Sequence, residues 1–218
     1  MFQVNSNTCK FWIVSILYFG ISVHSLTDNT FALEIVPHDT PDGQVERAVA
    51  VVIKGRSIEV TYQVGINPTT TKDQLIAWQV EGVAEAGDDD VELARLFCQE
   101  LEKRLTEGLS FTVDEIPLNA TVEEVAPFAM HHKAAVVRIV AELPDSTEEM
   151  DLVIADSNWA TMPGGARYAI KARKNALLTS SNAAPIIIRS TRVELGELEP
   201  EERAATCTLQ ATVKVLPN

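Results

Sequence analysis

The clearest pattern along the chain is a strict alternation of apolar and polar residues between residues 57 and 65. An antiparallel strand with one face against a core has this period of two. The segment before it, residues 47–53, is apolar at almost every position, and Lys54-Gly55-Arg56 separates the two segments. We therefore predict a β-hairpin with this tripeptide as its loop.

After Asn67-Pro68 the apolar residues recur with the period of a helix. We predict a short helix with a capping box formed by Thr71 and Gln74. A second helix is predicted from the acidic triplet 88–90 to Gly108, with an apolar stripe made by Leu93, Leu96, Phe97, Leu101 and Leu105. The triplet lacks the spacing of a calcium-binding EF-hand loop, so we interpret it as a helix cap and a solvated turn.

Strand-like segments return after residue 108, separated by Pro, Gly and acidic turns. We predict them at residues 109–113, 134–143, 151–156, 167–173, 186–192 and 204–215. A run of many such strands is typical of a β-sandwich. The expected fold is mainly β: an antiparallel β-sandwich, with an immunoglobulin-like topology as one option, that carries a two-helix insertion at about residues 70–108.

The N-terminal segment has the features of an export signal. Lys10 precedes an apolar run, Phe11 to Val23, that is shorter than the roughly 20 residues needed to span a bilayer. Residues 23–25 predict cleavage after Ser25, with Thr30-Phe31-Ala32 as a second candidate site. A retained membrane anchor and a buried helix are the alternatives. We expect residues 26–218 to form a single domain without a transmembrane segment, either secreted or located in the periplasm or cell envelope; two small domains are the other option.

The charge of the chain argues against some classes of function. The formal net charge is −13, from 31 acidic and 18 basic residues. This charge repels phosphate backbones, and no basic patch with interleaved aromatic residues is present, so we expect no nucleic-acid partner. The sequence also has no GxSxG or SxxK motif, and Gly164-Gly165 opens a strand, which does not suit a phosphate-binding loop. We therefore expect no enzyme, with a hydrolase that has no recognisable motif as an alternative.

Histidines and cysteines offer candidate sites of other kinds. His38 and Asp39 are adjacent, as are His131 and His132, and imidazole with carboxylate suits a divalent transition metal such as nickel, cobalt or zinc. Neighbouring residues of a strand point to opposite faces, so at most one of the paired histidines joins a common site if that segment is extended. Cys98 and Cys207 are the two cysteines after the export signal; they either form a disulfide or remain buried free thiols.

Two segments resemble a known family. They are "PHDTPDGQVERAVAVVIKGRSIEVTYQVGIN", residues 37–67, and "DSNWATMPGGARYAIKAR", residues 156–173. They look like the extracytoplasmic N-terminal domain of nickel/cobalt permeases and of HupE/UreJ-like hydrogenase and urease accessory membrane proteins. The resemblance implies an exported β-rich domain associated with metal-ion transport, with a membrane permease or envelope protein as partner. No transmembrane helices follow here, so transport itself is not implied, and the family's N-terminal histidine corresponds at best to His38.

The second of these segments also predicts a binding loop. Asp156, Asn158 and Trp159 follow a strand, and exported sandwiches often carry recognition on such loops. In the simpler interpretation, the two polar side chains bond the backbone of a turn while Trp159 folds over the end of the sandwich. The expected function is an accessory or binding module of the cell envelope, with a structural cell-surface interaction protein that binds no metal as the alternative.

Overall fold

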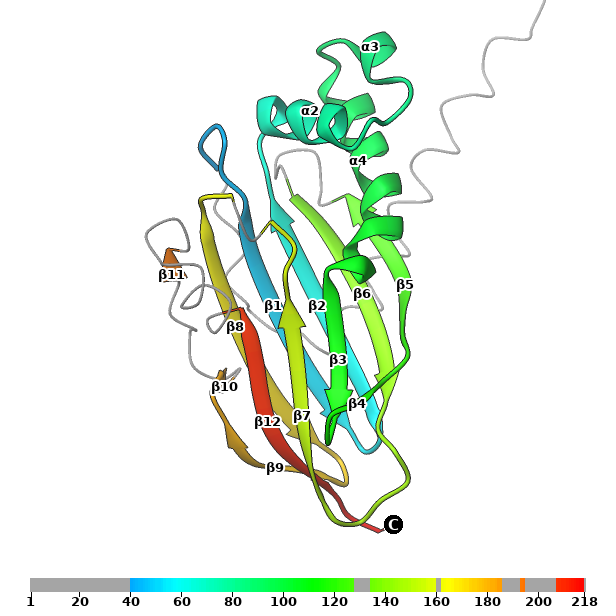
Figure 1. Cartoon of the computed structure of the whole chain (residues 1–218), viewed down its shortest axis with the longest axis vertical. Helices are drawn as coiled ribbons and strands as arrows, with labels where there is room; N and C mark the ends of the chain where they lie inside the picture. Colours follow the sequence, from blue (N-terminus) through cyan, green and yellow to red (C-terminus); the bar gives the residue numbers. More distant parts are fainter. Residues whose placement is uncertain (1–39, 128–133, 160–161, 186–192, 195–206, 218) are drawn as a thin grey trace, which may run out of the picture. The chain divides into compact units, whose positions relative to one another are not determined.

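A computed structural model describes residues 40–127, 134–159, 162–185, 193–194 and 207–217, and these form two β-sheets with helices grouped at one end (Figure 1). The predicted export signal, residues 1–25, and the strand predicted at 186–192 lie outside the described residues. The prediction of a mainly β, sandwich-like fold is confirmed. Within the described part of the chain, we found no helix with the length and hydrophobicity of a membrane span.

The first sheet has seven strands in the order β10-β8-β1-β2-β6-β5, with β11 also paired to β8. Its strands are β1 (Glu46–Lys54), β2 (Ser57–Gly65), β5 (Ala120–Pro127), β6 (Ala134–Glu142), β8 (Gly165–Arg173), β10 (Ala184–Pro185) and β11 (Val193–Glu194). The predicted hairpin is confirmed: β1 and β2 pair antiparallel from Glu46 and Gly65 to Lys54 and Ser57. Gly55 in its loop has a φ of 60°, a conformation that glycine adopts without steric cost.

The second sheet has five strands in the order β4-β3-β7-β12-β9. They are β3 (Leu109–Val113), β4 (Ile116–Pro117), β7 (Glu149–Asp156), β9 (Ala176–Ser181) and β12 (Thr208–Val215). Alternate residues of β7 and β12 face the core, including Leu152, Ile154 and Leu209. Neither β5 nor β9 was predicted from the sequence, because three of the six residues of β9 are polar and two glutamates interrupt β5.

The first sheet is mixed, so the predicted antiparallel pairing holds for most of its strands but not for all of them. β1 and β8 run parallel, in register from Arg47 and Ala166 to Lys54 and Arg173. The chain crosses from the second sheet into the first between β7 and β8, which brings β8 to the free edge of β1 in the same direction. The continuous apolar run of β1 fits this place, because a strand with neighbours on both edges and cover on both faces is buried at nearly every residue.

Three helices precede β3 in the described structure: α2 (Pro68–Ala77), α3 (Val83–Ala86) and α4 (Asp90–Arg104), followed by a 3₁₀ turn, η2 (Leu105–Glu107). α2 begins earlier than predicted, because Asn67 is its N-cap and Pro68 occupies the first turn. Asn67 Oδ1 accepts from the Thr70 amide at 2.7 Å, so Thr71 is not the cap. The acidic cap of α4 is confirmed, since Asp89 Oδ1 accepts from the amides of Val91 and Glu92.

The two cysteines are free thiols, so the structure contains no disulfide between them. Cys98 on α4 is half-buried against the main core, whereas Cys207, directly before β12, is buried with Ala166 in a separate cluster. Burial raises the pKa of the Cys98 thiol to about 11. The two side chains thus occupy different hydrophobic environments.

Candidate functional site

A cleft lies where the helices meet the loop after β7, and we call it the Trp159 cleft. Its volume is about 460 Å³. It is lined by Gln74 and Trp78 from α2 and its end, by Arg104, Glu107 and Gly108 at the end of α4 and after it, and by Ser157, Asn158, Trp159 and Met162 from the loop. Residues from three distant parts of the sequence therefore meet in one concave surface.

Two indole rings border the Trp159 cleft. The ring centroids of Trp78 and Trp159 are 6.4 Å apart, and the rings are tilted by 42°. Trp78 also stacks on Phe97, with centroids 5.5 Å apart, and the guanidinium carbon of Arg104 lies 5.5 Å from the Trp78 ring centroid. The Trp159 Nε1 donates to Gln74 Oε1 at 3.2 Å, which fixes the indole orientation.

The backbone of Trp159 is in the left-handed region, with a φ of 51°. This conformation is a genuine outlier for a bulky residue and costs roughly 1–3 kcal/mol. A tight turn imposes it: Asp156 Oδ1 accepts from the Asn158 amide at 2.9 Å and from Asn158 Nδ2 at 3.0 Å. Ser157 anchors the same turn to Gly108, whose carbonyl accepts from the Ser157 amide at 2.8 Å and from its hydroxyl at 3.0 Å.

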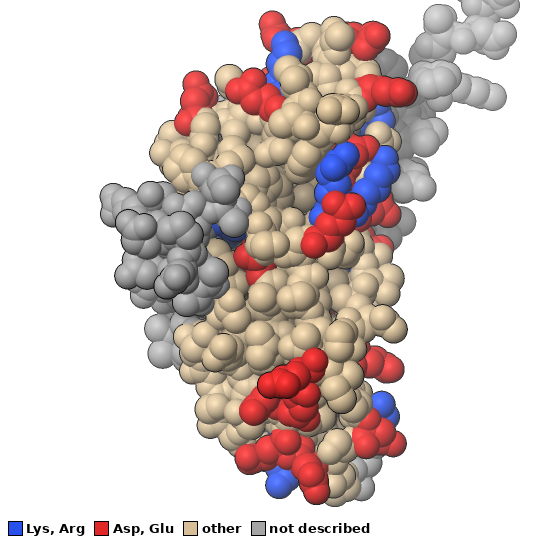
Figure 2. Space-filling view, in the orientation of Figure 1, with Lys and Arg blue, Asp and Glu red and all other residues tan. Residues whose placement is uncertain are grey.

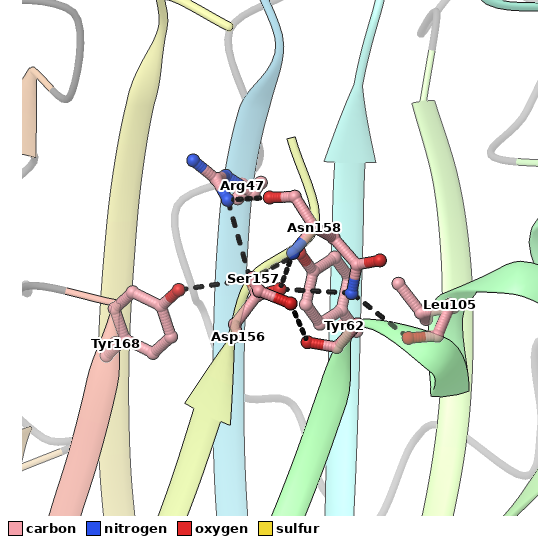
Figure 3. A network of polar contacts seen from close by, with 8 residues as sticks. Arg47, Tyr62, Leu105, Asp156, Ser157, Asn158 and Tyr168 are labelled. Atoms are coloured by element: carbon pink, nitrogen blue, oxygen red, sulfur yellow. Dashed lines mark hydrogen bonds and ion pairs between the residues drawn. The ribbon is translucent and has the colours of Figure 1, made fainter. Parts of the chain in front are cut away.

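Beneath the turn, the other oxygen of Asp156 gathers three side chains from the first sheet (Figure 3). Asp156 Oδ2 accepts from the Tyr62 hydroxyl at 2.6 Å and from the Tyr168 hydroxyl at 3.1 Å. It lies 3.7 Å from Arg47 Nη1, in an ion pair whose side chains are 1% and 0% exposed. These partners come from β2, β8 and β1, so the network ties the end of β7 in the second sheet to three strands of the first.

Arg47 completes the connection to the loop, because its Nη1 also donates to the carbonyl oxygen of Asn158. Its Nε is buried without a hydrogen-bond partner. Burial, reinforced by the Asp156 carboxylate, raises the pKa of Tyr62 and of Tyr168 well above the ordinary value of 10. Both phenols therefore stay protonated and act as donors to the carboxylate.

Gly108 permits the loop to approach the end of α4. A Cβ at this position would lie 2.2 Å from Asn158 Oδ1, closer than any real Cβ contact. Asn158 Nδ2 donates to the Leu105 carbonyl at 3.0 Å, which fastens the loop to the last helical turn. The absence of a side chain at Gly108 thus makes room for the amide that joins the loop to the helices.

The structure brings the three residues of the predicted binding loop together. Asp156 is buried and Asn158 is half-buried, and both hold the turn. Trp159 is half-buried and lies against the helices at the end of the sandwich. The polar side chains hold the turn and Trp159 covers the end of the sandwich, as the simpler interpretation of this segment describes. Trp159 also forms part of the wall of the cleft.

The predicted metal ligands His38, Asp39, His131 and His132 lie outside the described residues, so the metal site stays a prediction. Within the described ranges, no group of three or more His, Cys, Asp or Glu side chains is arranged to hold a metal ion.

Several residues of the site were missed by the sequence analysis. Arg47 and Tyr62 carry the network, and Trp78, Arg104 and Gly108 shape the cleft. Arg47 gave no clear signal, because it follows Glu46 at the start of β1, and the two charges looked like the polar end of the strand. Tyr62 looked like an ordinary core residue, since it falls on the apolar face of β2.

A second, wider cleft of about 700 Å³ lies against β2, β5 and β6, and its lining includes Arg56, Glu59, Glu123 and Arg138. These charges are already paired: Arg138 with Glu123 at 3.1 Å, Lys54 with Glu59 at 2.6 Å, and Arg56 with Asp145 at 3.4 Å. The Trp159 cleft combines aromatic rings with a hydrogen-bonded turn at residues 156–159, so we regard it as the candidate functional site.

Comparisons of the chain with protein-family models and with curated proteins found no match.

Proposed function

We propose that this protein is a non-catalytic binding module that holds a partner or ligand in the Trp159 cleft. The observation that supports this most strongly is the conformation of Trp159, a bulky residue at a φ of 51°. Strained backbone of this kind persists only where surrounding contacts over-determine it, and it is concentrated at binding sites and active sites. Here the contacts come from a buried network that spans both sheets.

Preorganisation of the turn and of the Trp159 indole favours binding. A ligand that orders a loop loses affinity to the entropy of that ordering, whereas a loop already held in place avoids this cost. The Asp156 network fixes the turn, and Gln74 fixes the indole of Trp159. We infer binding, and no catalysis, because Tyr62 and Tyr168, whose pKa values are strongly raised, are committed as donors to Asp156 beneath the cleft.

Two parts of the proposal rest on the sequence alone. Export follows from the signal-like segment of residues 1–25, and mass spectrometry of the protein from its natural source checks it by finding an N-terminus at Leu26. The role as an envelope accessory module linked to transition-metal handling follows from the family resemblance and from His38, Asp39, His131 and His132. Calorimetric titrations with nickel, cobalt and zinc that all show no binding would contradict that role.

The test of the binding function is Trp159→Gly. Glycine adopts a φ near 51° without strain, so relief of about 1–3 kcal/mol offsets much of the packing lost with the indole. We expect the variant to unfold in urea within about 1 kcal/mol of the natural protein, yet to lose the partner that the natural protein retains from a cell-envelope extract.

The matched control is Ile76→Ser, which removes a side chain that is 57% exposed on α2, outside the cleft lining. It should retain the same partner. Equal retention of that partner by Trp159→Gly and the natural protein would show that the cleft is not the binding site.

A further inference from the structure

We propose that the Trp159 cleft recognises a positively charged side chain, arginine or lysine, of a partner protein. This inference rests on the proposed binding function and names the chemistry of the group bound. It is supported by the paired indoles, by a carboxylate at the edge of the cleft and by the charge of the whole chain.

The cleft already holds a guanidinium group on an indole ring. The guanidinium carbon of Arg104 lies 5.5 Å from the Trp78 centroid, within the distance of about 6 Å at which an indole attracts a cation. Trp159 presents a second indole next to the first, tilted by 42°. Both rings are half-buried, and a cation–π contact strengthens as its surroundings lose water.

The charge of Arg104 is partly compensated within the protein, because Arg104 shares the Glu100 carboxylate with Lys103, whose Nζ lies 2.6 Å from Glu100 Oε1. The Arg104 Nε lies 3.2 Å from Glu100 Oε2, and the Arg104 Nη2 donates to the Trp78 carbonyl at 3.2 Å. Figure 2 shows basic and acidic side chains intermixed in this region of α4. Arg104 therefore opposes an incoming cation less than an unpaired arginine would.

Glu107 supplies the complementary negative charge. It lines the cleft, is exposed, and takes part in none of the ion pairs found between the described residues. The net charge of −13 also raises the local concentration of positively charged partners and speeds their association. A carboxylate that lines the same cleft as two aromatic rings, in an acidic protein, suits a guanidinium or an ammonium group.

The experiment compares two peptides of equal shape on the full chain, Ac-Gly-Gly-Arg-Gly-Arg-Gly-Gly-NH₂ and the same peptide with citrulline, which is uncharged, in place of arginine. The readouts are tryptophan fluorescence and the indole N–H signals in NMR spectra. We expect the arginine peptide to bind about tenfold more tightly than the citrulline peptide and to shift the Trp159 indole signal. Glu107→Gln should lower the affinity for the arginine peptide by about three- to tenfold. Glu149→Gln, an equal charge change on an exposed residue at the start of β7, should leave its affinity within about twofold.

Each other outcome overturns a stated part of the inference. Equal affinity of the two peptides, with the Trp159 indole shifted by both, would overturn the cationic ligand and retain the cleft as a binding site. If Glu107→Gln and Glu149→Gln weaken binding of the arginine peptide equally, the net charge of the protein, and not Glu107 itself, attracts the peptide. If arginine amide binds as tightly as the arginine peptide, the ligand is a small-molecule cation and not a side chain of a protein partner. If neither peptide shifts the indole signal, the cationic ligand is overturned, and the retention experiment with Trp159→Gly decides separately whether the cleft binds a partner.

Discussion

Asp156 is the residue on which the candidate site depends. One carboxylate oxygen holds the turn that positions Trp159, and the other accepts from Tyr62 and Tyr168 beside the Arg47 guanidinium. A buried carboxylate with this many donors is satisfied in spite of its desolvation. The same side chain thus connects the sandwich core to the geometry of the cleft.

Replacement of Asp156 by asparagine should therefore be costly. Asp156→Asn keeps the size of the side chain but leaves the charge of Arg47 buried without a counter-ion, and breaking a buried pair in this way costs about 3–5 kcal/mol. Urea unfolding measures the loss. The control is Asp145→Asn, because Asp145 pairs with Arg56 in solvent with 92% of its side chain exposed, and such pairs contribute about 0–1 kcal/mol. Equal destabilisation by the two variants would show that burial of the Arg47–Asp156 ion pair does not determine the loss of stability.

The local part of this arrangement was predictable from the sequence, and the long-range part was not. Asp156 and Asn158 are two residues apart, so their turn was predictable from local chemistry. Tyr62 lies 94 positions from Asp156, and Arg47 lies 111 positions from Asn158, so neither contact has a local signal. Their pairing depends on which strand of the first sheet the end of β7 faces.

At the scale of elements, the cleft depends on how closely the loop after β7 approaches the end of α4. Gly108→Ala should weaken this contact, because the new Cβ would lie 2.2 Å from Asn158 Oδ1 and displace that side chain from the Leu105 carbonyl. Overpacking of this kind costs about 1–3 kcal/mol. We also expect the Trp159 indole N–H signal to move in NMR spectra, since its loop shifts.

The control for this substitution is Gly55→Ala in the hairpin loop. No atom lies within 4 Å of a Cβ placed at Gly55, but its φ of 60° disfavours alanine. The variant should lose about 1 kcal/mol from backbone strain alone and leave the Trp159 signal unchanged. An unchanged signal in Gly108→Ala as well would contradict the close approach that we describe.

The elements themselves were predictable to different degrees. The hairpin of β1 and β2 and the helix α4 carry strong periodicity and end signals, so their positions agree with the sequence patterns. The parallel pairing of β1 with β8 was not predictable, because periodicity within a strand does not identify its neighbour. The contact between Trp78 and Trp159 was not predictable either, because it depends on how the helices pack on the sandwich.

At the scale of the whole molecule, the network links the two sheets, and we therefore expect them to unfold together. Tyr62, Tyr168 and Arg47 belong to the first sheet and Asp156 to the second, so unfolding of either sheet exposes all four groups to water. The free energy of unfolding of the whole protein should therefore respond to the ionisation of the buried tyrosines.

This response has a definite sign. Burial and the Asp156 carboxylate raise the pKa of Tyr62 and Tyr168 in the folded protein, whereas in the unfolded chain both ionise near pH 10. The unfolded state therefore loses these protons first as the pH rises. The contribution of each tyrosine is complete below about pH 10, and above it the free energy of unfolding falls by up to about 1.4 kcal/mol per pH unit for each tyrosine.

Urea unfolding from about pH 8 to about pH 11 measures this decline. Because the Cys98 thiol, with its pKa of about 11, is deprotonated in the same range, the comparison uses Cys98→Ser as the background for every variant. Tyr62→Phe and Tyr168→Phe should each lower the stability at pH 8 by about 1–2 kcal/mol, because a buried hydrogen bond is lost. Above about pH 10, each should also make the decline shallower, and the double variant should have the shallowest slope. If the free energy of unfolding falls with pH equally steeply in the double variant and in Cys98→Ser alone, ionisation of the two phenols does not contribute to the pH dependence of stability.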